Sequence, residues 1–186
     1  MKIEKKIALL ASVNRKKTLI LKALTWDEDN KLTLESTNDE GVVDLNKLSW
    51  LRIEAVSGLS VEQVDEMPQP DINSIKNFVI STISKTAEEI AKELDLKFEQ
   101  HEDSMVKILL QPLGDGTTSY KLKYPTGKLT KILDQETDDE RRMFTLCEFC
   151  TSLNELQLKS MSTPDWNSLQ DILDKFLGKT SEFFRQ

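Results

Sequence analysis

The chain has 186 residues, of which 38% are hydrophobic and 31% charged, and its formal net charge is −7. This length suits one large domain or two small ones of roughly 80–90 residues each. No apolar run approaches the roughly 18 residues of a transmembrane helix, and no lysine or arginine block could follow a phosphate backbone. Because the apolar run Ile7 to Ser12 is too short for a secretory signal, we expect a soluble cytoplasmic protein with no membrane or nucleic-acid partner.

Strand-like segments open the chain. Residues 3–13 and 18–26 flank a polar turn at residues 14–17. A third strand is expected over Lys31 to Ser36, after the polar residues 27–30. The N-terminal part therefore predicts a small meander of strands.

Helices are expected from Asp44 onward. The first covers Asp44 to Ser57, and Ser60 and Gln63 then form a capping-box pattern, which satisfies free N–H groups at a helix start. Pro70 suits the first turn of the next helix, and the charge of Asp71 favours its N-terminus. Apolar residues at spacings of three and four mark the expected core-facing stripes: Leu45, Leu48, Ala55, Val56 and Leu59, then Ile72, Ile75, Phe78, Val79 and Ile83.

An acidic segment follows at residues 83–104. It holds three lysines and seven acids, a local charge of −4 that is more than half of the chain's total. The helix from Pro70 is expected to continue to Leu94, and residues 97–104 to be irregular. We interpret the segment as a helical extension and a solvated linker, with an acidic docking surface as the alternative.

A second hairpin is expected after this segment. Residues 105–113 and 117–124 flank Gly114-Asp115-Gly116, a strong tight-turn signal. After Pro125-Thr126-Gly127 a short helix is expected through Leu129 and Ile132.

Two longer helices complete the chain. One is expected over Asp138 to Thr151, and the last begins near Pro164, with Gly178 as its expected stop. Their apolar stripes are Met143, Phe144, Leu146, Cys147, Cys150 and Leu153, then Trp166, Leu169, Ile172, Leu173 and Phe176.

The two parts of the chain are similar to each other. Residues 56–75 align with residues 150–169 without a gap, and caps, turns and apolar positions coincide. Identical pairs are Leu59 and Leu153, Gln63 and Gln157, Met67 and Met161, Pro70 and Pro164, Asp71 and Asp165, Asn73 and Asn167, and Ser74 and Ser168; upstream, Trp50 matches Phe144. The pattern predicts an internal duplication.

The sequence therefore predicts an α+β chain of two tandem homologous modules, each a β-hairpin or meander followed by about three helices. The expected boundaries are 1–82 for the first module, 83–104 for the helical extension and acidic linker, and 105–186 for the second module.

The second module resembles the small bacteriophage tail assembly chaperones. Val106 to Leu129 follows their strand, glycine turn, second strand and Pro-Thr-Gly entry into helices, and Cys150 to Leu173 follows their helical ending. The likeness covers nearly all of the second module and mainly Asp44 to Ile80 of the first. It implies a non-enzymatic factor of the host cell cytoplasm that binds a tape measure or tail tube protein during tail assembly.

No residue is selected as catalytic, cofactor-binding or metal-ligating. His101 lies in the acidic linker. Because it is the single histidine, a multi-histidine metal site is excluded. Cys147 and Cys150 form a Cys-x-x-Cys pattern, but they fall in mid-helix where the first module has Ile53 and Val56, so buried apolar cysteines are expected.

A glycine-containing segment and an acidic cluster are also expected to be structural. Gly114-Asp115-Gly116 is expected to be a hairpin turn rather than a phosphate loop, and the acids at residues 138–140 suit a helix start. Trp50 and Trp166 are expected in the core.

The leading functional hypothesis is a tail assembly chaperone-like protein that shields apolar helical segments of a client. Part of its helical surface should then be apolar yet exposed. The alternatives are a structural virion protein of the baseplate or tail completion type, an adaptor or inhibitor of a host factor, and a small enzyme, which would need a deep pocket with several perturbed acids.

Overall fold

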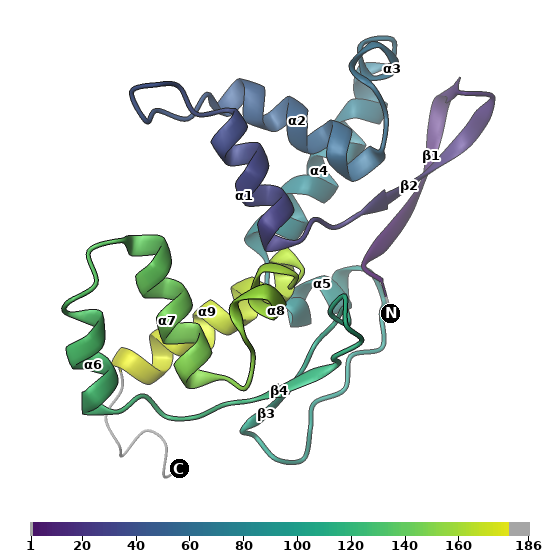
Figure 1. Ribbon diagram of the computed structural model, residues 1–186. Coiled ribbons are helices and arrows are strands. Elements are labelled where there is room, and N and C mark those ends of the chain that lie inside the picture. Colours follow the sequence, from purple (N-terminus) through teal and green to yellow (C-terminus); the bar gives the residue numbers. More distant parts are fainter. Residues whose placement is uncertain (1, 179–186) are drawn as a thin grey trace.

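The computed structural model describes residues 2–178, and its helices and two small antiparallel sheets confirm the predicted α+β class. The elements of the first half are β1 (Glu4–Val13), β2 (Lys16–Lys22), α1 (Trp26–Glu35), α2 (Leu45–Ser57), α3 (Val61–Asp65) and α4 (Gln69–Ser84). They are followed by α5 (Ala87–Glu93), β3 (Val106–Ile108), β4 (Ser119–Lys121), α6 (Gly127–Leu133), α7 (Asp139–Cys150), α8 (Glu155–Lys159) and α9 (Thr163–Gly178). Figure 1 shows the first half above the second, with α5 beside their junction.

The first hairpin is tighter than expected. β1 and β2 are antiparallel, with Ile7 opposite Leu19, and only Asn14 and Arg15 form the turn between them. Both turn residues have positive φ, 51° and 63°, which is the backbone of a two-residue hairpin turn that matches the twist of the strands.

The third strand predicted over Lys31 to Ser36 is wrong, because these residues belong mostly to helix α1. Thr25 and Glu28 form a capping box at its start, and three acids in the first turn favour the helix N-terminus. The start signal at Thr25 therefore prevails over the weak strand propensity of the residues that follow it.

The predicted helices α2, α3 and α4 are confirmed, and so is the Ser60–Gln63 capping box. The predicted stripe of α2 is partly wrong, since Leu45 is 74% exposed and Ala55 is exposed. Its buried apolar residues are Leu48, Ile53 and Val56.

The expected continuation of α4 to Leu94 is also wrong. The helix ends at Ser84, where the Asn167 side-chain amide donates to the carbonyls of Ile83 and Lys85 at 3.1 and 3.0 Å. A new capping box at Thr86 then starts α5. The apolar residues of α5 are buried together with residues beside the first and second hairpins, whereas the charged residues of α5 are exposed. The buried residues are Ile3, Ala87, Ile90, Ala91 and Leu110.

Strands β3 and β4 are much shorter than predicted. Beyond Ile108 the backbone N–H groups of Leu110 and Gln111 donate to the Asp165 carboxylate, at 2.7 and 3.1 Å, and Pro112 has no N–H to donate. The first half has the same contact, because the N–H groups of Leu10 and Ala11 donate to Asp71. In both halves a helix aspartate thus replaces part of the strand ladder.

The helices of the second half follow the predicted order. The Asn154–Gln157 capping box is confirmed, α3 and α8 begin 94 residues apart at Val61 and Glu155, and so do α4 and α9. That this repetition arose by duplication stays a prediction. The chain after Gly178, where a helix stop was expected, lies outside the described residues.

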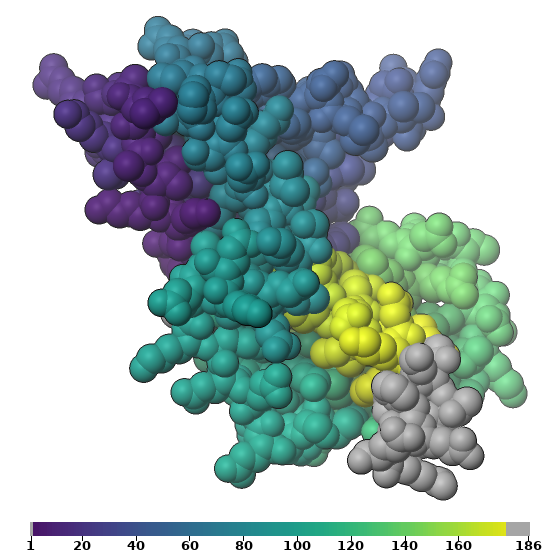
Figure 2. Space-filling model, turned by 180° about the vertical axis from the view of Figure 1, so that it is seen from behind, coloured from purple at the N-terminus to yellow at the C-terminus, as the bar shows by residue number. Residues whose placement is uncertain are grey.

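Helix α1 joins the two halves. At its start Trp26 packs against the core of the second half, and further along it the Arg52 guanidinium of α2 forms a two-pronged ion pair with Asp29, at 2.6 and 2.7 Å. Figure 2 shows the halves stacked on one another from behind. None of the helices described over residues 2–178 has both the length and the apolar character needed to cross a bilayer.

Replacing Trp26 with alanine should lower the free energy of unfolding by about 3 kcal/mol, because it removes a ring packed between two others. Trp50→Ala is the matched control and should cost about 1 kcal/mol or less, since Trp50 is exposed. Urea denaturation of both variants measures the difference. Equal costs would contradict the structural role assigned to Trp26.

Candidate functional site

The first half carries an open groove between α2 and α3. It has a volume of about 290 Å³, and part of its lining is apolar and accessible. Trp50 is 41% exposed and Val61 51% exposed. The lining residues are Lys47, Trp50, Leu51, Glu54, Val61, Val64 and Asp65.

Local sequence fixes both walls of this groove. Helix α2 ends at Ser57, and the φ of 66° at the following Gly58 lets the chain reverse at once. The Ser60–Gln63 capping box then starts α3. The Gln63 amide also donates to the Asn14 side chain at 3.0 Å, which ties α3 to the hairpin turn. The caps at Gly58 and Ser60 therefore fix how α3 follows α2, and the hydrogen bond to the hairpin turn holds α3 in place.

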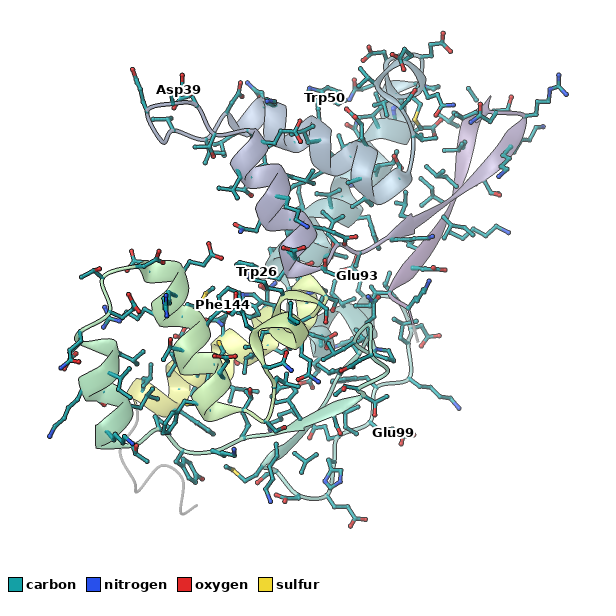
Figure 3. The ribbon with its side chains drawn as sticks, viewed as in Figure 1. Trp26, Asp39, Trp50, Glu93, Glu99 and Phe144 are labelled. Carbon is teal, nitrogen blue, oxygen red and sulfur yellow. The ribbon has the colours of Figure 1, made fainter. Side chains whose placement is uncertain are left out.

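The matching face of the second half is closed. Phe144, which lies 94 residues after Trp50, is only 4% exposed because Trp26 covers it. The Trp26 and Phe144 rings meet edge to face with centroids 4.8 Å apart, and the Trp26 and Trp166 centroids are 5.5 Å apart. In Figure 3 Trp26 and Phe144 lie together at the junction, whereas Trp50 lies on α2 away from them.

What remains open beside Phe144 is polar. A hollow of about 520 Å³ there is lined by Asp138, Glu140, Arg141, Phe144, Thr145, Glu148 and Glu155. Thr145 and Glu155 stand where the first half has Leu51 and Val61. The two halves thus differ in chemistry at the same position, and only the first presents an apolar groove.

Charges of both signs lie around the apolar groove. The pKa of Glu54 is raised, chiefly by burial and further by the carboxylates of Asp65, Glu35 and Glu62. Two lysines are also close: Lys47 donates to the backbone carbonyl of Glu35 at 2.6 Å, and the ammonium of Lys76 lies 5.6 Å from the Trp50 ring centre. The groove can therefore accept an apolar side chain, and Asp65 on its α3 wall can face a cation.

A second cavity, of about 430 Å³, lies where α5, residues 98–109 and α9 meet. Its titratable lining includes Glu88, Glu99, His101, Glu102, Lys107, Tyr120, Asp165 and Asp171. Burial raises the pKa of Asp165 to about 6, against the opposing effect of hydrogen bonds from Ser162, Leu110 and Gln111. Because Asp71 makes the equivalent strand contact in the first half, we assign the Asp165 carboxylate a structural role.

The two cysteines are buried in α7, as the sequence predicted. Both are fully inaccessible, and burial raises the pKa of Cys147 to about 12 and that of Cys150 to about 11. Such thiols are poor nucleophiles at neutral pH.

The remaining sequence candidates do not converge. His101 is exposed in the segment before β3, Gly116 ends the turn of the second hairpin with φ of 88°, and Asp138 caps α7. Within residues 2–178 no group of three or more histidine, cysteine, aspartate or glutamate side chains is arranged to hold a metal ion.

The groove itself was missed by the sequence reasoning, which placed Trp50 in the core. Trp166 is buried as expected, but Trp50 is not. The helical period contained the signal: Leu48, Ile53 and Val56 share one face of α2, and a residue two positions after Leu48 falls on the other face.

Comparisons with protein-family models, curated proteins and solved structures found no match to this chain.

The Asp165 carboxyl should make stability depend on pH. Its pKa is raised, so its contribution to the free energy of unfolding is full below about pH 4 and is lost as the pH rises through about 6. Asp165→Asn should cost about 1–3 kcal/mol, and this cost should shrink between about pH 4 and pH 7. Urea denaturation of both proteins across this range measures it, and a constant or growing cost would refute the assignment.

The thiols should resist modification in the folded protein. At about pH 8 neither Cys147 nor Cys150 should react with Ellman's reagent, whereas both should react at once in denaturant, because unfolding removes the burial that raises their pKa. Fast reaction of either thiol in the native protein would show that α7 opens readily.

Proposed function

We propose that this protein is a non-enzymatic binding factor that shields an apolar segment of a client protein, in the manner of a phage tail assembly chaperone. The observation that carries the proposal is the open groove at Trp50, set against the covered face at Phe144. A folded chain that closes one such face with its own tryptophan and leaves the other open has an apolar surface available for another protein.

The groove suits binding of modest strength. Trp50 and Val61 are the most exposed apolar side chains of its lining, and covering them would contribute on the order of 2 kcal/mol from apolar burial alone. Tryptophan is also the residue that most often dominates binding energy at protein interfaces. A factor that must release its client during assembly needs affinity of this moderate kind.

The proposed client is a tape measure or tail tube protein. Support for this identity is the likeness of residues 106–129 and 150–173 to the tail assembly chaperones. The alternatives are a structural role in the virion and an adaptor that acts on a host factor; both would use the same groove for a different partner.

Co-expression with the tape measure and tail tube proteins of the same genome tests the proposal. The chain should keep the tape measure protein in the soluble fraction and co-purify with it. Trp50→Ala should weaken recovery roughly tenfold, as expected for loss of an interface tryptophan. The matched control is Leu156→Ala, which changes an 81% exposed leucine on α8 of the other half.

Two results would overturn this function. Binding to neither protein, together with presence of the chain in purified particles, would favour a structural virion component. Equal effects of Trp50→Ala and Leu156→Ala would place the client elsewhere on the surface.

A further inference from the structure

The closed face of the second half shows how such a face is covered. Residues 24–26 pair with residues 161–163 as a short antiparallel bridge: the Trp26 N–H donates to the Met161 carbonyl at 2.8 Å, and the Thr163 N–H donates to the Leu24 carbonyl at 2.9 Å. The chain then enters α1 at once, and the Trp26 ring packs on Phe144. The segment that covers this face thus consists of an extended residue, then an aromatic residue, Trp26, at which a helix begins.

The first half has the same corner without an occupant. Met67 and Gln69 stand 94 residues before Met161 and Thr163. Within residues 2–178 neither the Met67 carbonyl nor the Gln69 N–H makes a hydrogen bond, and Gln69 is exposed. Pro68 lies between them, where the second half has Ser162. Ser162 uses neither its N–H nor its carbonyl in the bridge to residues 24–26, so a proline at this position is compatible with such a bridge.

One charged position beside the anchor is reversed between the halves. Both halves also hold a lysine ammonium over the equivalent ring, 5.1 Å from the Phe144 centre and 5.6 Å from the Trp50 centre. In the second half Lys159 on α8 has a raised pKa, chiefly from its hydrogen bond with Glu155, and the carboxylates of Glu140 and of Asp27 in the first turn of α1 add to it. At the position of Lys159 the first half has Asp65. An acid after the anchor thus faces Lys159 in the second half, and a cation at the same place would face Asp65 in the first.

We propose that the groove of the first half docks a client segment in which an aromatic residue begins a helix and is followed by lysine or arginine. This inference rests on the proposed function and specifies the chemistry of the client. The aromatic side chain packs against Trp50, the preceding residue bridges to Met67 and Gln69, and the basic first turn faces Asp65 and Glu54. A cationic residue opposes the helix dipole slightly, so the Asp65 carboxylate is what selects it.

The chain's own α1 supplies the probe. One fluorescent peptide has the sequence of residues 22–35, and the second has lysine in place of Asp27, Glu28 and Asp29. Fluorescence anisotropy against the intact protein measures the affinity of each. The lysine peptide should bind at least about tenfold more tightly than the acidic one, and its advantage should shrink as salt is added.

Charge exchange on the protein gives the decisive comparison. Asp65→Lys should cancel or reverse the preference of about tenfold, whereas Leu156→Ala should leave it unchanged. Alanine at the tryptophan of the lysine peptide, or Trp50→Ala in the protein, should weaken binding by at least about tenfold. The peptide variant needs no change to the protein, so a folding defect cannot imitate this result.

The inference is wrong if the peptide tryptophan is dispensable or if the charge preference survives Asp65→Lys. These outcomes are separable from failure of the proposed function. A tape measure protein kept soluble by a chain that ignores the lysine peptide would retain the function and reject this mode of docking. A groove that binds the peptide but not the tape measure protein would retain the docking mode and change the client.

Discussion

The packing of Trp26 against Phe144 and Trp166 determines how the rest of the molecule is arranged. It anchors the start of α1 in the second half, while the Arg52–Asp29 ion pair anchors the same helix to α2 in the first. This helix of ten residues therefore holds the two cores together, alongside the contacts of α9 with α4 and α5. The same ring closes the apolar face of the second half and so makes the open face of the first half the accessible one.

Much of the fold could be predicted because its signals are local. Capping boxes at Ser60 and Asn154 and the aspartates at positions 44 and 138 mark helix starts through hydrogen bonds to neighbouring residues. The wrong predictions concern helix and strand ends that are set by residues distant in the sequence. Asn167 ends α4 from across the junction, and Asp165 accepts from the Leu110 and Gln111 N–H groups directly after β3.

The groove could be predicted only in part. The sequence predicted exposed apolar helical surface, but not its place, because Trp50 and Phe144 occupy equivalent positions and differ only in what covers them. That cover comes from Trp26, far away in the sequence. Even identical pairs diverge for this reason: Asn167 caps α4, whereas Asn73 bonds only to Gln69 on its own helix.

The bridge between residues 24–26 and 161–163 also sets an order of events during synthesis. The ribosome releases α1 long before the corner that receives it has been translated. The nascent first half must therefore wait with Trp26 uncovered, and the two cores can lock together only when α9, the last described helix, has left the exit tunnel.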